Sequence, residues 1–137
     1  AVFLPVVAGM GGNSGTQTLT IMVRGLALGE VSWESGKGIL LKEIKVGINN
    51  GIATGIIAGT VAYLWKGNYM LGLVLGGAMT INIVVAGVVG TLVPLILKKL
   101  NVDPAIASSI FVTTFTDAVG FLSFLGLASV LLHHFPV

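Results

Sequence analysis

The chain has 137 residues, of which 55% are hydrophobic and only 9% are charged, and its mean hydropathy is +1.02. A soluble domain carries about 25% charged residues, so this chain has too few charges to cover a water-facing surface, which disfavours a very apolar soluble bundle. The net charge of +2 is unremarkable and we expect no nucleic-acid partner, while the absence of cysteine excludes disulfides and thiolate metal sites.

Long apolar runs predict four membrane-crossing segments, at about residues 1–28, 46–65, 69–97 and 104–132. A helix needs about 20 apolar residues to cross the hydrocarbon core of a bilayer. The runs lack the alternating polarity of barrel strands, and lipid-embedded backbone must satisfy its polar groups internally. We therefore expect an all-α, polytopic transmembrane helix bundle forming a single domain over 1–137, in a piece of a longer protein.

The first segment contains an unusually polar stretch, GMGGNSGTQT, at residues 9–18. Asn13, Gln17 and Thr20 are three or four residues apart, so they share one helix face. Glycines such as Gly12 weaken the helix locally and can expose carbonyl groups toward a cavity. Amide and carbonyl oxygens suit Mg²⁺, Ca²⁺ or hydrated ions, so we expect these residues to line a polar path. A packing kink is the alternative.

The segment at about residues 31–45 is too polar to cross a membrane. It predicts an amphipathic helix lying on the cytoplasmic surface, with four apolar residues on one side, namely Trp33, Leu40, Leu41 and Ile44. A solvated loop is the alternative, because Gly36 and Gly38 lower helix propensity.

The second and third segments share a stripe of small residues repeated every four positions. On the second segment these are Gly47, Gly51, Gly55 and Gly59, and on the third they are Gly72, Gly76 and Thr80. Small residues at this spacing let membrane helices approach closely, so we interpret the stripes as packing surfaces, with pore lining as the alternative. Pro94 is expected to bend or end the third segment.

The fourth segment opens at Asp103–Pro104, a typical N-cap and first helical residue. Ser109, Thr113 and Asp117 follow at intervals of four, with Gly120 beside them, so one face is polar through most of the membrane. A carboxylate near the midplane costs roughly 2.5–3.5 kcal/mol and usually marks an ion or proton pathway. The alternative is an Asp117 that is neutralised or hydrogen-bonded within the bundle.

Charges predict the orientation. Most lysines fall in the loops at 29–45 and 98–103, whereas the loop after the second segment has only Lys66, so the positive-inside rule makes the first two loops cytoplasmic. An aromatic cluster would then mark the outer boundary, formed by Tyr63, Trp65 and Tyr69. The adjacent His133 and His134 would be solvent-facing residues at the outer interface.

Two long motifs resemble the MgtE family of magnesium channels and transporters. PVVAGMGGNSGTQTLTIMVRGLALGE, residues 5–30, is similar to the second membrane helix of that family, with its P-x5-G-G-N-x-G-x-Q and R-G-L-A-x-G-E patterns. DPAIASSIFVTTFTDAVGF, residues 103–121, resembles the fifth helix, with its D-P-A start and T-x3-D-x2-G core. The resemblance implies an MgtE-like membrane domain carrying helices two to five. The family's first helix and its cytoplasmic nucleotide- and magnesium-sensing domains are not in this sequence.

The resemblance also implies a function. It places Asp117 at the family's pore aspartate, which meets hydrated Mg²⁺ near the axis of a homodimer, and Thr113 where a backbone carbonyl helps to hold the ion's water shell. Asn13 and Gln17 fall in the signature of the helix that lines the same pore. We therefore expect a dimeric pore that conducts hydrated Mg²⁺ down its gradient across the cell membrane. It would not be an enzyme and would use no organic cofactor.

Two other functions remain open at this point. An ion- or proton-coupled secondary transporter would use Asp117 to carry protons. A purely structural membrane fragment would be inactive without its missing helix and regulatory domains. Flux that persists without a proton or sodium gradient favours a channel, whereas failure of any flux from an intact dimer favours the inactive fragment.

Overall fold

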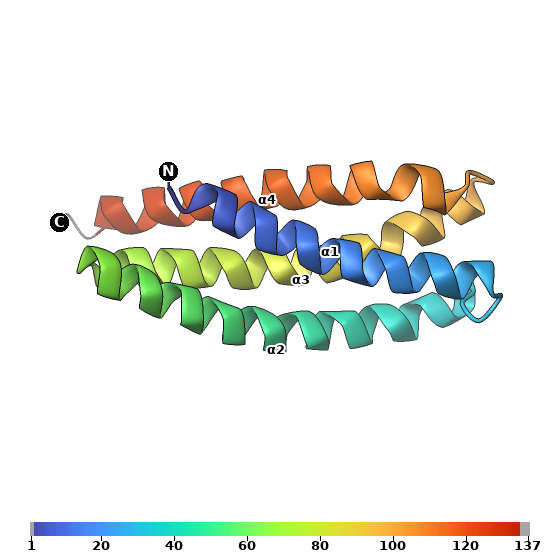
Figure 1. The fold of residues 1–137 in the computed structure, drawn as a ribbon, viewed down its shortest axis with the longest axis horizontal. Helices are drawn as coiled ribbons and strands as arrows, with labels where there is room; N and C mark the ends of the chain where they lie inside the picture. Colours follow the sequence, from blue (N-terminus) through green and yellow to red (C-terminus); the bar gives the residue numbers. More distant parts are fainter. Residues whose placement is uncertain (1, 135–137) are drawn as a thin grey trace.

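The computed structural model describes residues 2–134, with the side chains of all of these except residues 107 and 132–134. Four helices follow one another through short turns: α1 (Leu4–Ala27), α2 (Trp33–Lys66), α3 (Tyr69–Lys99) and α4 (Pro104–His134). They lie side by side in an elongated bundle (Figure 1), and the described part of the chain has no strand. The expected all-α bundle is confirmed. The expectation for the histidine side chains lies outside the described residues.

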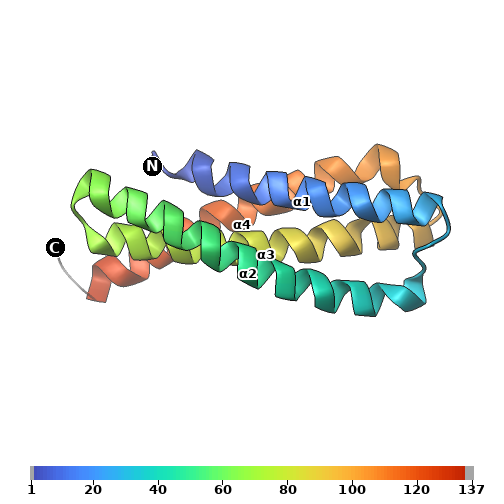
Figure 2. The same cartoon turned by 60° about the horizontal axis from the view of Figure 1, so that its bottom comes forward.

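The longest helix, α2, joins two segments that the sequence analysis separated. It runs without interruption for 34 residues, or about 51 Å at 1.5 Å per residue, and crosses α3 obliquely (Figure 2). Ser32 and Ser35 form a capping box at its start, which fixes the helix there. Gly36 packs against the side chain of Leu95 on α3. The segment at 31–45 is thus helical from Trp33 onward, but it continues into the second segment and packs on the bundle.

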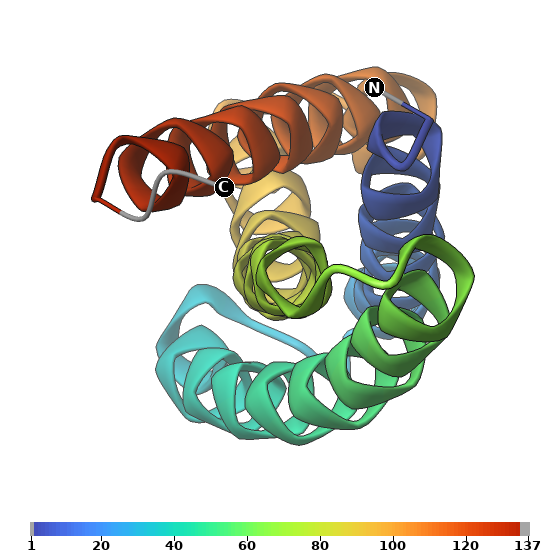
Figure 3. The same ribbon diagram turned by 90° about the vertical axis from the view of Figure 1, so that its left-hand side faces the viewer.

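Helix α3 lies in the middle of the bundle and contacts the other three helices, which surround it (Figure 3). It supplies much of the apolar core, including Leu75, Ala78 and Met79, each at most 2% exposed. Helix α1 also contacts α4, whereas α1 and α2, although consecutive in sequence, have almost no direct contact. A groove is therefore left between α1 and α2, with α3 as its floor.

Polar side chains start α3 and α4 as helix caps. Asn68 Oδ1 accepts a hydrogen bond from the backbone N–H of Leu71 at 3.2 Å, and Gly67 before it has a φ of +68° that favours glycine. Asp103 Oδ1 accepts from the N–H of Ala105 at 2.9 Å, which confirms the predicted cap. Pro94 lies buried inside α3, which continues to Lys99, because its neighbours in the bundle hold the helix together across the proline.

The glycine stripes bring α2 and α3 into backbone contact. A Cβ atom placed on Gly59 would lie 2.6 Å from the carbonyl oxygen of Gly72, and one on Gly55 would lie 2.6 Å from that of Gly76. Thr80 Oγ1 also donates a hydrogen bond across the interface to the carbonyl of Gly51 at 3.0 Å. The packing interpretation of these stripes is confirmed, since no path remains between the two backbones where they touch.

This contact predicts a stability difference between two glycines of the same helix. We expect Gly59→Ala to lower the free energy of unfolding by about 1–3 kcal/mol, because the added methyl group must push the Gly72 carbonyl away. Gly38→Ala should be neutral or stabilising by up to about 1 kcal/mol, since nothing lies within 4 Å of a Cβ there and alanine favours helix. Thermal unfolding in detergent measures both, and equal midpoints would contradict the prediction.

The outer surface of the bundle is apolar along most of its length. Large aliphatic side chains are exposed on α2 and α4, for example Ile57, Leu64, Ile106 and Leu122. Among the described residues, α3 and the part of α4 from Ser108 to Leu131 are long and apolar enough to cross a membrane by length and composition. Helices α1 and α2 do not meet this criterion. Exposed hydrocarbon on this scale needs lipid as its solvent.

Candidate functional site

Asp117 lies in the middle of α4 and is exposed in the single chain. It follows Pro104 by thirteen positions, which places it about 20 Å from the start of the helix. Its side chain forms no hydrogen bond or ion pair with any other residue that the structure describes. The alternative of an Asp117 hydrogen-bonded within its own chain therefore has no support. An unpartnered carboxylate at this depth requires a cation, water or another chain.

The neighbouring turns of α4 are polar but internally hydrogen-bonded. Thr113 is half-buried and its hydroxyl donates to the carbonyl of Ser109 at 3.0 Å. The carbonyl of Thr113 accepts from the hydroxyl of the buried Thr116 at 3.1 Å. Ser109 itself is exposed on the same polar side. The carbonyl expected to hold an ion's water shell thus already has a hydroxyl partner.

The polar stretch of α1 is helical throughout. Residues 9–18 show no break, and the hydroxyls of Thr16 and Thr20 donate to the carbonyls four residues earlier, those of Gly12 and Thr16, both at 2.8 Å. The glycines instead allow close packing, because a Cβ on Gly15 would lie 2.6 Å from Val112 on α4. The predicted weakening of the helix at this glycine run is not observed, and no backbone opens into a cavity there.

The α1–α4 contact places two polar faces next to each other. Gly12 on α1 approaches Thr116 on α4, with 3.9 Å from a Cβ placed on Gly12 to the Thr116 hydroxyl. Asn13 follows Gly12 and Asp117 follows Thr116, and both are exposed. Helix α3 contacts both α1 and α4. Thr20 is exposed as well, and it follows Asn13 by seven residues, which places both on the same face of α1. We call the exposed polar residues beside this contact, Asn13, Thr20 and Asp117, the open α1–α4 face.

Gly120 is placed differently from the sequence-based expectation. It was expected beside Asp117 on the polar face, but it is buried, and a Cβ there would lie 2.8 Å from the Nδ2 atom of Asn82 on α3. Asn82 is fully buried and donates from Nδ2 to the carbonyl of Val7 on α1 at 2.8 Å. Gly120 is therefore a packing residue within a single chain, because α4 needs a residue without a side chain where it contacts the amide of Asn82.

A second polar region lies in the groove between α1 and α2. Asn13, Ser14 and Gln17 of α1 face Asn50 and Thr54 of α2 across a cavity of about 310 Å³. Asn13 and Gln17 therefore border two polar regions, the open α1–α4 face and this groove. Both residues were expected to share one path with Asp117. In the structure, α2 forms the opposite wall of the cavity that they line.

The groove contains an acid that the sequence analysis did not single out. Glu43 of α2 is half-buried and its Oε2 atom accepts a hydrogen bond from the hydroxyl of Thr18 on α1 at 2.9 Å. Glu43 was read as part of a polar surface segment, where acids are ordinary. The one feature that could have indicated a buried role was its position, three residues before the membrane segment expected to begin at residue 46. In the structure, α2 continues through that position without a boundary.

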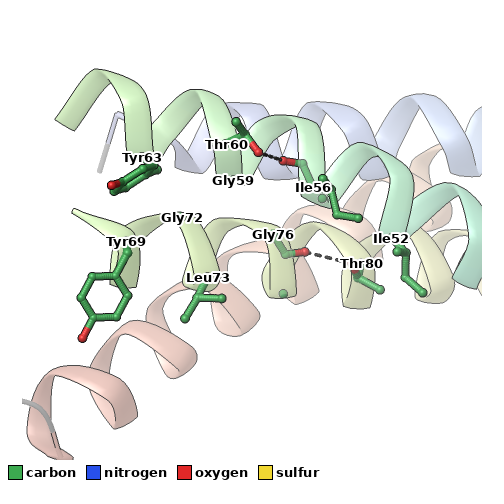
Figure 4. Close-up of a pocket in the computed structure, with 12 residues that line it drawn as sticks. Ile52, Ile56, Gly59, Thr60, Tyr63, Tyr69, Gly72, Leu73, Gly76 and Thr80 are labelled. Atoms are coloured by element: carbon green, nitrogen blue, oxygen red, sulfur yellow. Dashed lines mark hydrogen bonds between the residues drawn. The ribbon is translucent and has the colours of Figure 1, made fainter. Parts of the chain in front are cut away.

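A cavity of about 480 Å³ between α2 and α3 lacks the lining of an ion site. Its walls are mainly aliphatic, with Ile52, Ile56 and Leu73 beside the glycine contact and two tyrosines at one end (Figure 4). The hydroxyl of Thr60 donates to the carbonyl of Ile56 at 2.7 Å, so it turns toward its own helix. No carboxylate or amide lines this cavity. Among the described residues, no group of three or more histidine, aspartate or glutamate side chains could enclose a bare metal ion.

Comparison with known proteins supplies a family. Residues 4–127 match the family model MgtE, described as a divalent cation transporter. The chain is 35% identical over 133 residues to the magnesium transporter MgtE of Bacillus subtilis, covering 97% of this chain and 30% of that protein. It is 37% identical over 135 residues to the magnesium transporter MgtE of Enterococcus faecalis, and 34% over 132 residues to that of Thermus thermophilus. These matches cover 98% and 96% of this chain, but 30% and 29% of those relatives. The chain thus spans under a third of their length.

Proposed function

Because this chain belongs to the MgtE family of divalent cation transporters, we propose that it forms the ion-conducting membrane domain of a magnesium transporter in the cell membrane. The printed names of the relatives support magnesium as the transported ion. The observation that carries the proposal for this chain is Asp117, an exposed carboxylate without a partner among the described residues, deep in an apolar bundle. Intramembrane acids of this kind line ion or proton pathways.

The proposed pore requires two copies of the chain. One Asp117 supplies a single negative charge at this level, whereas Mg²⁺ carries two positive charges. A C₂ dimer that joins the open α1–α4 faces would bring two Asp117 carboxylates together and remove both polar faces from lipid. Two unit charges at about 4 Å interact by about 4 kcal/mol at an effective dielectric constant of 20, which helps to offset the dehydration of the site.

The donor set favours a hydrated ion. Mg²⁺ loses its water slowly and prefers six oxygen ligands at about 2.0–2.1 Å, whereas a pair of carboxylates supplies too few protein ligands for the bare ion. In the proposed site, Asp117 and the carbonyl of Thr113 hold the water shell through outer-shell hydrogen bonds. The hydroxyl of Thr116 now occupies one lone pair of that carbonyl and would have to turn away when the ion binds. Such indirect contacts release the ion readily, as conduction requires.

The proposed orientation follows the lysines. The turn before α2 with the lysine-rich start of that helix, residues 29–45, and the turn at 98–103 face the cytoplasm, and the turn with Lys66 faces outward. In that orientation, Lys99 lies 4.6 Å from the ring centre of Trp33 at the inner end, and Lys66 lies 4.8 Å from that of Trp65 at the outer end. Cation–π pairs of this kind are suited to the interface between lipid and water, where aromatic and basic side chains gather.

The transport mode is tested by the driving force. We expect the full-length parent protein, reconstituted in liposomes, to take up Mg²⁺ when the Mg²⁺ gradient is the only gradient present, because the proposed pore needs no coupled ion. A Mg²⁺-sensitive dye inside the liposomes measures the uptake. Strict dependence on a proton or sodium gradient would replace the channel with a coupled transporter, and absence of uptake from folded dimer would support a structural role.

A further inference from the structure

We propose a second cation site in the groove between α1 and α2, where Glu43, Gln17 and Asn50 hold a hydrated divalent cation near the lysine-rich end of the bundle. This proposal rests on the proposed function, which supplies the divalent cation, but the site uses neither Asp117 nor the open α1–α4 face. Its three polar side chains come from α1 and α2, around a cavity that α3 also lines. Only Gln17 among them was expected from the sequence to line a polar path.

The side chain of Glu43 lines the groove, and most hydrogen-bond acceptor positions of its carboxylate are unused. Its Oε2 atom accepts one hydrogen bond, from the hydroxyl of Thr18 at 2.9 Å. An ionised carboxylate has about four acceptor positions, and the side chain of Glu43 has no other hydrogen-bond or ion-pair partner among the described residues. The backbone carbonyl of Glu43 lies against Gly87 of α3, 3.3 Å from a Cβ placed there, so this turn of α2 packs on the bundle.

Glu43 lies in a cavity with a mixed lining. The cavity has a volume of about 140 Å³, and its polar lining residues are Glu43, Ser14, Gln17, Thr18 and Asn50, beside apolar residues such as Ile21, Val46 and Ile83. Ser14, Gln17 and Asn50 also line the cavity of about 310 Å³, so the two cavities adjoin. No lysine or arginine of the described chain lines either cavity. Carboxylate, amide and hydroxyl oxygens are ligands for hard cations or for their water shells.

The volume of a hydrated ion requires both cavities. Six waters at about 30 Å³ each occupy roughly 180 Å³. The cavity that Glu43 lines, about 140 Å³, is smaller than this, so the water shell would extend into the adjoining cavity of about 310 Å³. A single carboxylate with two amides is too small a set to replace those waters. The cation would therefore stay hydrated, with Glu43 as the charged contact and the amide oxygens of Gln17 and Asn50 as hydrogen-bond acceptors for its waters.

The site lies on the inner side of Asp117. Thr116, next to Asp117, packs at the level of Gly12 on α1, whereas Glu43 bonds Thr18, six residues further along the same helix. Six residues correspond to about 9 Å along the helix axis. An ion that moves from the level of Asp117 toward the lysine-rich end would thus reach the groove about two helical turns later. The groove would then act as a second, inner binding site on the ion's path.

The test uses Mn²⁺ as the probe, in crystals of the full-length parent protein. We expect anomalous density for Mn²⁺ about 4–5 Å from a carboxylate oxygen of Glu43, the distance of an outer-shell contact. Glu43→Gln keeps the acceptor for Thr18 and the side-chain volume but removes the charge, so this density should disappear. Glu34→Gln is the matched control, the same change at an exposed position of the same helix, and should retain it.

Titration in solution supplies a second measurement. Mn²⁺ binding followed by electron paramagnetic resonance should lose one equivalent per chain in Glu43→Gln, and that site should weaken severalfold in Asn50→Ala, an exposed position that leaves the packing intact. No density near Glu43 in the wild type, or unchanged density and binding in Glu43→Gln, overturns the proposal. Asp117→Asn should leave the Glu43 density in place, so failure at Asp117 and failure at Glu43 are separate results.

Discussion

Asp117→Asn in the full-length parent protein is expected to reduce Mg²⁺ uptake by at least about 100-fold. The change removes two negative charges from the proposed dimer site, and each charge pair at about 4 Å is worth about 4 kcal/mol at an effective dielectric constant of 20. Half of both pairs together amounts to about 4 kcal/mol, which exceeds the roughly 2.8 kcal/mol that corresponds to a factor of 100. Uptake into liposomes, divided by the amount of folded dimer, is the measurement. Monovalent leak is expected to persist.

Two controls separate charge from packing. Asn is close in size to Asp, and Asp117 is exposed with no described partner, so the variant should fold and unfold like the wild type. Glu34→Gln removes a carboxylate at an exposed position outside the proposed pore and should transport normally. Wild-type uptake by Asp117→Asn at matched protein would remove Asp117 from the pore. A loss that follows a lower dimer yield would assign it a structural role.

Gly90→Leu is expected to be the most destabilising single change in the bundle core, by more than about 3 kcal/mol. A Cβ placed on Gly90 would lie 2.8 Å from the carbonyl oxygen of Gly15 and 3.0 Å from Cβ of Thr18. Overpacking in a close-packed interior costs about 1–3 kcal/mol when side chains can move, and here α1 itself would have to move. Thermal unfolding in detergent and the yield of folded protein measure the effect.

Gly126→Leu is the matched control for that variant. Nothing lies within 4 Å of a Cβ at Gly126, which is exposed on α4, so the same side chain would extend into lipid and the same gain in helix propensity would apply. We expect an unfolding temperature equal to or above that of the wild type. If both variants unfold alike, the close approach of α1 to α3 at Gly90 does not limit stability.

Much of the architecture was predictable because it depends on local composition and period. Four apolar runs separated by turns predicted four helices, and the described part of the chain has four, three of them with nearly the expected ends. Helix α2 differs, because it begins at Trp33 and not near residue 46. The N-cap at Asp103 follows from a short-range hydrogen bond, and the glycine stripes follow from a four-residue spacing on two neighbouring helices. The site at Asp117 was also predictable as a candidate, since a carboxylate in an apolar helix stands out without any knowledge of its neighbours.

What remained undetermined was which helix covers which polar face. Helical periodicity shows that Gly120 and Asp117 fall near each other on α4, but only the approach of Asn82 from α3 makes one of them a buried packing residue and leaves the other open. The glycine run of α1 likewise predicted a locally weakened helix, whereas in the structure these glycines pack against neighbouring helices.

The sequence by itself therefore determined the class of the protein, its helices and its central acid, because these are properties of composition, of hydropathy and of residues within one or two turns. The tertiary structure alone decided that α1 and α2 stay apart and that the unbroken α2 brings Glu43 to Thr18. The two residues are 25 positions apart on helices that hardly touch. Their meeting depends on how both helices pack against α3, and no local pattern along the chain encodes that arrangement.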